Sequence, residues 1–347
     1  MIRHVDISEC RYGDILGREV INKSGVMVVA ANTMMNNYIK KKLIHLGIQD
    51  IWVYEPEDNE LITFDCIEYS NFKLKYENNI FTMKEVINDL VTGKGLNVNR
   101  VQDIANSIFG ELKQVKYLIK YLRNLRKTDD YTCMHSINVA FYGMLIGKWL
   151  KLPEKEIKEI IKAGLLHDIG KTKISMEILN KKERLSPLEY EEMKNHTIYG
   201  YEIIKGNNEI SEEVKRAVLM HHERENNSGY PIGVKGESID TYSKIIAVAD
   251  VYDAMTSDRV YKKRSTPFDA FRMFEIEGKS LFDVKVVRTF ITNIAPYYTG
   301  LCVQLNTGEY GEIAYIPPHN ITKPVICMRA DFIDISERND LRIVSLL

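Results

Sequence analysis

Side chains able to bind a metal ion gather in one part of this sequence. Five of its eight histidines lie between residues 135 and 222, and two adjacent pairs, His167-Asp168 and His221-His222, stand among them. Imidazole and carboxylate groups together favour Fe, Mn or Zn over the all-oxygen ions Mg and Ca. The residue types therefore predict a metal centre but do not choose among those three metals.

Both adjacent pairs are predicted to lie at the ends of helices. Pro153 fits the first turn of a helix whose buried face runs to His167-Asp168, and Ser211 fits the N-cap of a helix that runs into His221-His222. Adjacent helical side chains project about 100° apart, so neither pair would chelate one ion from one helix face. Two ions side by side would use both members of each pair, with Asp168 as the bridging carboxylate.

Two further candidates, His196 and Asp250, fall in other predicted helices. The residues from Ser186 to Glu189 have the pattern of a capping box, which predicts that His196 lies well inside the helix that follows. Asp250 ends an apolar run, where an unpaired carboxylate would be costly to bury. A single buried histidine is usually a hydrogen-bonded core residue. Buried carboxylates on several helices, however, need compensating charge, which metal ions supply.

Charge and composition exclude several other classes of protein. The 347 residues include 47 basic and 48 acidic side chains, so no overall positive field favours DNA, RNA or an anionic membrane as a partner. No apolar run reaches the roughly 20 residues of a membrane span. Residues 1–10 lack the apolar core of a secretory signal, so we expect a cytoplasmic protein. The five cysteines form no CxxC pair, which argues against a disulfide framework or a thiolate zinc site.

The chain divides into four predicted parts, and the fold class is mainly α. Residues 1–60 form a small α/β unit, because a hairpin pattern precedes a helix that ends at Gly47. Residues 61–128 are a helical linker region, either a docking or dimerising surface or an ordinary amphipathic helix packed on its own domain. Residues 129–292 are helical almost throughout. Residues 293–347 carry a hairpin signal and form a small β-rich appendage.

The metal-binding motifs, in this order, resemble the HD-GYP family, a branch of the HD metal-dependent phosphohydrolases that degrade cyclic di-GMP. The resemblance covers a little under half of the chain, and its matching stretches are Asp130–Ser136, His167–Lys171, His196, His221–Glu223, Gly229–Pro231 and Ala249–Lys262. It implies an HD-type, all-helical catalytic domain at residues 129–292 and a cyclic dinucleotide as the substrate.

The resemblance also implies a set of metal ligands. They are His135, His167, Asp168, His196, His221, His222 and Asp250. Some family members bind a third ion through a glutamate one helical turn before the first histidine, and Tyr131 stands there in this chain. We therefore expect two divalent ions, Fe or Mn, with Zn as an alternative. Asn226-Asn227 replaces the family's Asp-Gly, which leaves the ligands in place but changes the loop that carries Gly229-Tyr230-Pro231.

Asp168 and Lys171 are the predicted catalytic residues. Lys171 lies one helical turn after His167 and, if the helix continues, faces the same site. There it would hold a phosphate oxygen or assist proton transfer, and a solvated surface lysine is the alternative. Arg259 and Lys262 would place positive charge near the second phosphate of a cyclic dinucleotide.

Tyr230 is the remaining candidate for substrate binding. Gly229 is expected to permit an unusual backbone angle, and Pro231 pushes Tyr230 toward an extended backbone. From that position the ring either stacks on guanine or packs the loop, and the sequence does not separate these roles.

Three hypotheses of function follow. The leading one is a phosphodiesterase that opens cyclic di-GMP to linear pGpG, and further to GMP, by attack of a metal-activated water. The second is a receptor or scaffold that binds cyclic di-GMP or a signalling protein partner with little turnover, and it is motivated by Asn226-Asn227. A missing metal ligand would favour this second hypothesis, and none of the expected ligands is missing from the sequence. The third keeps the enzyme but changes the substrate to another cyclic dinucleotide, such as 3′,3′-cGAMP. A homodimer is a further hypothesis for assembly.

Overall fold

Helices form most of the structure, as the spacing of apolar residues predicts. The computed structural model describes residues 2–54, 60–113, 115, 119, 121–122, 131–257, 265–329 and 331–346. The chain forms two units. Unit 1 comprises Met1–Tyr69, Ser265–Met273 and Phe290–Leu347, and unit 2 comprises Ser70–Arg264 and Phe274–Thr289.

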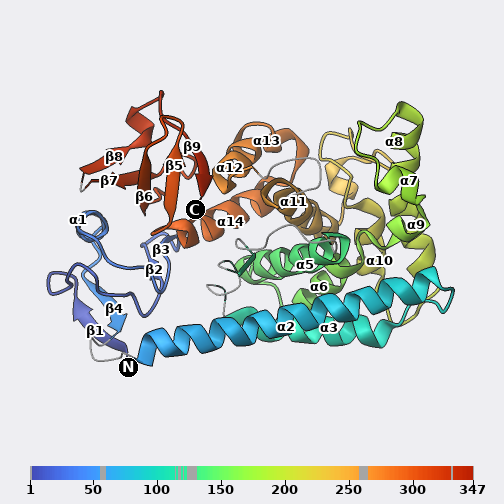
Figure 1. The fold of residues 1–347 in the computed structure, drawn as a ribbon, viewed down its shortest axis with the longest axis horizontal. Helices are drawn as coiled ribbons and strands as arrows, with labels where there is room; N and C mark the ends of the chain where they lie inside the picture. Colours follow the sequence, from blue (N-terminus) through green and yellow to red (C-terminus); the bar gives the residue numbers. More distant parts are fainter. Residues whose placement is uncertain are drawn as a thin grey trace. The chain divides into compact units, whose positions relative to one another are not determined.

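The helices and strands are labelled in Figure 1. The helices are α1 (Asn37–His45), α2 (Glu60–Val91), α3 (Val98–Gly110), α5 (Tyr131–Trp149), α6 (Glu154–Leu166), α7 (Met176–Leu179), α8 (Pro187–Lys194), α9 (His196–Ile204), α10 (Glu212–Met220), α11 (Thr241–Thr256), α12 (Pro267–Ile276), α13 (Gly278–Leu281) and α14 (Val284–Ile294). Short 3-10 helices are η1 (Glu111–Lys113), η2 (Ile169–Lys173), η3 (Gly236–Ser238), η4 (Ala295–Tyr298) and η5 (Ile335–Glu337). The strands are β1 (Ile2–Asp6), β2 (Val20–Ile21), β3 (Met27–Val29), β4 (Asp50–Tyr54), β5 (Cys302–Leu305), β6 (Tyr310–Tyr315), β7 (Val325–Met328), β8 (Asp331–Asp334) and β9 (Ile343–Leu346).

In unit 2 an apolar stretch of the sequence becomes the buried helix α5, which packs against α6 and α11. Helices α5 and α6 meet through their backbones. A Cβ added at Gly164 of α6 would lie 2.6 Å from the Cα atom of Ala140 on α5, so only glycine permits this approach. His135 and Asp250 lie on α5 and α11, and His167 directly follows α6. The packing of three helices therefore sets the spacing of three predicted ligands.

Helices α2 and α3 lie side by side in unit 2 (Figure 1). Arg100 of α3 joins them, because its guanidinium lies 2.6 Å from Asp89 and 3.7 Å from Glu85 on α2. Residues 70–113 also bury apolar side chains, among them Phe72 and Val86. The amphipathic pattern of this region is thus used for packing within unit 2.

Unit 1 has one core made from both ends of the chain. Leu16 and Val53 share a hydrophobic cluster with Tyr315 and Val325, and the Asn36 amide donates to the Ala314 carbonyl over 3.2 Å. The strands form two small antiparallel pairs, β1 with β4 and β2 with β3, and a five-stranded antiparallel sheet in the order β8-β7-β6-β5-β9.

Several local predictions are confirmed in unit 1. The hairpin, at residues 20–29, and the helix before Gly47 are present, and β5 and β6 form the predicted C-terminal hairpin. The mainly α fold class with a C-terminal set of strands is also confirmed. The division into four domains stays a prediction. Among the described helices, none combines the length and apolar character needed to cross a membrane.

Gly164 offers a test of the contact between α5 and α6. Gly164→Ala forces a methyl group against the α5 backbone, so we expect a loss of about 1–3 kcal/mol in the free energy of unfolding, measured by urea denaturation. The matched control is Gly110→Ala, because a Cβ at Gly110 of α3 meets nothing within 4 Å. Equal stability of the two variants would contradict the close approach.

Candidate metal centre

Two of the predicted ligand pairs stand where α-helices end. His167 caps the C-terminus of α6, and His221 caps the C-terminus of α10. Asp168 and His222 follow directly after these caps. The prediction that both pairs lie at helix ends is confirmed, and all four side chains are largely or fully buried.

His196 lies at a helix start rather than inside a helix. The Ser186 capping box is present and begins α8 as predicted, but α8 ends at Lys194 and the chain turns at Asn195. The prediction that His196 lies well inside that helix is therefore wrong. The turn closes because the Asn195 N–H donates to the carbonyl of Glu192, only three residues earlier.

Three of the histidines are held by the same backbone contact. In each, Nδ1 lies within hydrogen-bond distance of the carbonyl oxygen three residues earlier: His167 and Gly164 (2.8 Å), His196 and Met193 (2.6 Å), and His221 and Val218 (2.9 Å). A carbonyl oxygen can only accept, so each Nδ1 carries the proton and each Nε2 presents a lone pair. This fixes the tautomer that metal binding through Nε2 requires.

His135 is oriented by carboxylates instead of a backbone carbonyl. Its Nδ1 atom lies 2.7 Å from Oδ2 of Asp253, and its Nε2 atom lies 3.1 Å from Oδ1 of Asp250. Burial by itself would lower the pKa of His135, but the hydrogen bonds to these two aspartates outweigh it and raise the pKa to about 9. A metal ion bound at Nε2 would have to displace a proton from this ring.

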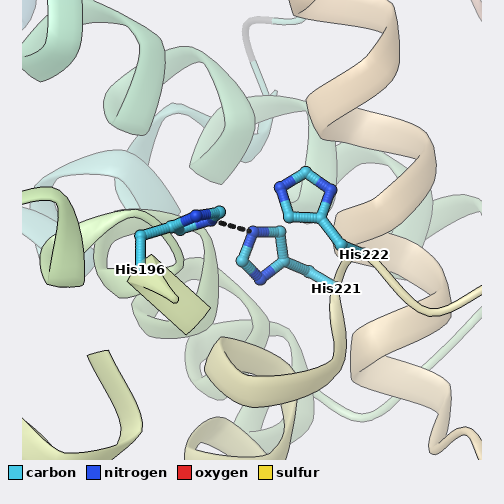
Figure 2. A group of neighbouring side chains, drawn as sticks. All are labelled: His196, His221 and His222. Atoms are coloured by element: carbon cyan, nitrogen blue, oxygen red, sulfur yellow. Dashed lines mark hydrogen bonds between the residues drawn. The ribbon is translucent and has the colours of Figure 1, made fainter. Parts of the chain in front are cut away.

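The seven predicted ligands converge in space. Their donor atoms form groups within 4.8 Å, composed of His196, His221 and His222; of His135, His167 and Asp250; and of His167, Asp168 and His221. Figure 2 shows the first group, in which a dashed line joins the Nε2 atoms of His196 and His221, which lie 3.4 Å apart. Oδ1 of Asp168 lies 3.3 Å from His196 Nε2, and Oδ2 lies 3.4 Å from His167 Nε2. The carboxylate therefore lies between the other two groups.

The geometry corrects the argument from adjacent residues. His221 and His222 belong to one group, and their ring centroids are 4.2 Å apart. The separation of about 100° applies only inside a helix, and both residues lie after Met220, the last residue of α10. Two donor groups, one on either side of Asp168, are therefore the feature of the site that favours two ions.

Electrostatics keep the carboxylates charged and most of the imidazoles neutral. Burial would raise the pKa of Asp168, but the charge of Lys171 and the neighbouring histidines hold it well below its usual range. The pKa of Asp250 is likewise lowered despite burial, chiefly by His135. Burial lowers the pKa of His222 to about 3 and that of His221 well below its usual value. Neutral imidazoles and ionised carboxylates are the forms that bind metal ions.

Two buried atoms of the cluster independently fit a metal site. His167 Nε2 and Asp168 Oδ1 are both buried, and neither has a hydrogen-bond partner among the described residues. Leaving such atoms unpaired is costly, and a divalent cation would satisfy both. The donor set of histidine nitrogens and carboxylate oxygens suits Fe, Mn or Zn.

Lys171 faces the cluster through a tighter turn than the sequence suggested. The α-helix ends at Leu166, and after the turn at His167 and Asp168 the chain forms the 3-10 helix η2, which has three residues per turn. Lys171 Nζ therefore contacts Asp168 Oδ2, three residues earlier, at 2.5 Å. The side chain is 29% exposed, so it borders the buried carboxylate and also reaches solvent.

The loop after His222 is held by a buried glutamate that the sequence did not single out. The Glu223 carboxylate accepts hydrogen bonds from the backbone N–H groups of Ile232, Gly233 and Val234. Gly229 is required for space rather than for an unusual backbone angle, because its φ lies outside the left-handed range and a Cβ would lie 2.4 Å from Glu223 Cα.

Tyr230 and Asn227 complete this loop. The Tyr230 ring stacks on His222 with the centroids 4.6 Å apart, so the ring packs against a predicted ligand, and the Tyr230–Pro231 peptide is cis. Asn227 has φ +65°, in the left-handed region that asparagine tolerates better than most residues. The Asn226-Asn227 replacement therefore fits a turn in which glycine would also be suitable.

Three residues with predicted roles cannot be placed in the site. Arg259 and Lys262 lie outside the described residues, and so does the side chain of Tyr131. The predicted roles of these three residues stay predictions.

Sequence reasoning also missed residues that support the ligands. Asn138 donates a hydrogen bond to Asp253, and Asp253 contacts His135, all deep in unit 2. Their spacing gave a usable signal, because Asp253 lies three residues after Asp250 and Asn138 lies three after His135, on the same helix faces.

Comparisons with known proteins identify the segment that carries these residues. A family model described as an HD domain matches residues 125–286. A cyclic di-GMP phosphodiesterase of Pseudomonas aeruginosa is 33% identical over 225 residues, which cover 65% of this chain and 54% of the relative. A cyclic di-GMP phosphodiesterase of Thermotoga maritima is 30% identical over 285 residues, which cover 79% of this chain and 74% of the relative.

A solved structure shares the fold. It is described as an HDG"Y"P protein from Bdellovibrio bacteriovorus, and it matches with a TM-score of 0.53 and 14% identity, covering 84% of this chain and 98% of that chain. The present chain spans about half the length of the Pseudomonas aeruginosa relative, at 54%.

Because the buried imidazoles are neutral, the folding stability of the metal-free protein depends on pH. The pKa of His222 falls from an ordinary 6.5 to about 3 on folding, so the unfolded chain binds more protons between these values. Stability present above pH 6.5 is lost as the pH falls toward 3. We expect the thermal midpoint of chelator-treated protein to fall as the pH falls over this window. In His222→Gln the fall should be smaller, by the equivalent of a few kcal/mol in the free energy of unfolding.

The control for this experiment is His45→Gln, which changes an exposed histidine of α1. It should follow the parent protein at every pH. Parallel curves for the parent and His222→Gln would contradict the assignment of a neutral, buried His222.

Proposed function

The chain belongs to the HD-GYP family of the HD metal-dependent phosphohydrolases, and from this premise we propose that it hydrolyses cyclic di-GMP to linear pGpG. The observation that carries the proposal is the convergence of all seven expected ligands, with their donor atoms in groups within 4.8 Å. A binding protein without turnover has no need for this complete, buried and oriented set of donors.

We propose two divalent ions, Fe or Mn, with Zn as an alternative. One would be held by His135, His167 and Asp250, and the other by His196, His221 and His222, with the Asp168 carboxylate shared between them. When bound, such ions lower the pKa of a water nucleophile and neutralise phosphate charge. The two oxygens of Asp168 face different histidines, which supports the bridging role.

Lys171 supplies the positive charge nearest to Asp168. Its ammonium group neutralises the carboxylate and, being partly exposed, can also donate a hydrogen bond to a non-bridging phosphate oxygen of an incoming substrate. Lysine can serve as a catalytic group in this way without being a metal ligand.

Tyr230 and the residues after α11 are proposed to contact the rest of the nucleotide. The Tyr230 ring already packs on His222 and borders the cluster, so it holds that ligand in place and forms one wall for a base. Arg259 and Lys262 stay the predicted contacts of the second phosphate. The cytoplasmic location and the homodimer also stay predictions.

The function is tested by turnover of a panel of cyclic dinucleotides with anaerobically purified protein loaded with Fe or Mn. We expect cyclic di-GMP to be cleaved to pGpG, separated by chromatography, and the same traces show whether GMP follows. Preferential cleavage of 3′,3′-cGAMP would change the substrate and keep the reaction. Metal-loaded protein that binds cyclic di-GMP without cleaving any member of the panel would instead support the receptor hypothesis.

Asp168→Ala is expected to lose bound metal and turnover together, because it removes the carboxylate between the donor groups. Metal content measured by elemental analysis, alongside the turnover assay, checks this outcome. The control is Asp103→Ala, which removes an exposed carboxylate from α3. Turnover at the parent rate in Asp168→Ala would remove the bridging role.

Lys171→Ala is expected to keep its metal and to lose about 100-fold or more in kcat. The matched control is Lys173→Ala, since Lys173 belongs to the same 3-10 helix and is exposed. If both variants retain the parent kcat, Lys171 is only a surface lysine.

A further inference from the structure

Three buried side chains connect helix α2 to His135. The Tyr76 hydroxyl on α2 lies 2.6 Å from Oδ1 of Asn138, and Nδ2 of Asn138 lies 2.9 Å from Oδ1 of Asp253. Oδ2 of Asp253 in turn lies 2.7 Å from Nδ1 of His135. All four side chains are buried, so these polar atoms are hydrogen-bonded to one another inside the protein and not to bulk water.

The donor and acceptor at each step are fixed by the chemistry of these groups. The Asp253 carboxylate only accepts, so His135 must donate through Nδ1 and Asn138 must donate through its amide nitrogen. The amide oxygen of Asn138 then faces Tyr76, whose hydroxyl must donate. When a metal ion displaces the proton on Nε2, His135 presents its lone pair there, on the atom that faces Asp250 and Asp168.

Asp253 is held from a second side as well. The Ser257 hydroxyl, at the C-terminal end of α11, donates to the same Oδ1 atom of Asp253 over 2.8 Å. A carboxylate that accepts three hydrogen bonds has little freedom to rotate. The orientation of the His135 ring therefore depends on residues from α2, α5 and α11.

The Tyr76 ring packs in an aromatic cluster, while its hydroxyl reaches Asn138. The Tyr76 ring lies 4.9 Å from Tyr121, 6.1 Å from Phe141 and 6.3 Å from Phe72, measured between centroids. Tyr76 is fully buried, and its helix precedes the segment that matches the HD domain. The support of a predicted ligand thus begins outside that segment.

We infer that Tyr76 and Asn138 are positioning residues, which orient His135 for metal binding by holding Asp253. The inference rests on the proposed metal centre. Helix α2 therefore affects metal affinity through these hydrogen bonds. A displacement of α2 would remove the Tyr76 hydroxyl from Asn138 and loosen the hydrogen bonds that Asn138 makes to Asp253 and Asp253 to His135.

The test is a double-mutant cycle read out by Mn²⁺ affinity, measured from the electron paramagnetic resonance signal of free Mn²⁺ without substrate. Asp253→Asn is expected to weaken binding about 10- to 100-fold, because an amide can donate to His135 and favour the wrong tautomer. Tyr76→Phe keeps the ring and removes only the hydroxyl, and should weaken binding about 2- to 10-fold. In the Asp253→Asn background, Tyr76→Phe should have no further effect.

Phe72→Leu is the control, because it alters the same aromatic cluster without touching the hydrogen-bonded chain. It is expected to lower the thermal midpoint and leave the Mn²⁺ affinity unchanged. A loss of affinity in Phe72→Leu equal to that in Tyr76→Phe would overturn the inference, since general packing would explain both. Full additivity of Tyr76→Phe and Asp253→Asn would overturn it too.

The outcomes also separate this inference from the proposed function. A parent protein that binds none of Mn²⁺, Fe²⁺ and Zn²⁺ would overturn both, and the cycle is read out with Fe²⁺ or Zn²⁺ if only those ions bind. A parent that binds Mn²⁺ and cleaves cyclic di-GMP, together with a Tyr76→Phe variant of equal affinity, would overturn only the positioning role.

Discussion

The structure depends on the burial of two carboxylates among five imidazoles. Charged groups can be kept away from water only when opposite charge or hydrogen bonds compensate them. Here Lys171 contacts Asp168, and His135 contacts Asp250. Two donor atoms, His167 Nε2 and Asp168 Oδ1, are left without such a partner among the described residues. The interior of unit 2 is thus arranged for a cation, and the surrounding helices serve to hold the donors in place.

Helix ends solve the problem of orienting several histidines at once. A carbonyl in the last turn of a helix lacks a backbone partner, and a histidine three residues later can donate to it. His167 and His221 use this contact at the ends of α6 and α10, and His196 uses it at the corner between α8 and α9. The same hydrogen bond therefore completes the helix end and selects the nitrogen that faces the site.

The helices, and the residues whose side chains converge in one cluster, could be predicted from the sequence because both follow from local patterns. Capping residues such as Ser186 and Ser211, and the motifs of a known family, are visible without coordinates. Sequence reasoning failed where a long-range contact or a helix break decides the geometry. The corner at Asn195 and the convergence of His221 with His222 depend on where helices stop, which periodicity resolves poorly. The Tyr76 contact joins residues 62 positions apart, and no local pattern reports it.

The contact at Gly164 has a consequence for the choice of ion. His135 lies on α5 and His167 follows α6, and these helices meet backbone to backbone at Ala140 and Gly164. Side chains can change rotamer to let two helices move apart or together, but main-chain atoms already in contact cannot yield. The gap between these two imidazoles, whose centroids are 5.1 Å apart, is thus set by the backbone itself. A metal site built on this fixed spacing would favour cations whose ionic radius fits the gap between the two imidazoles.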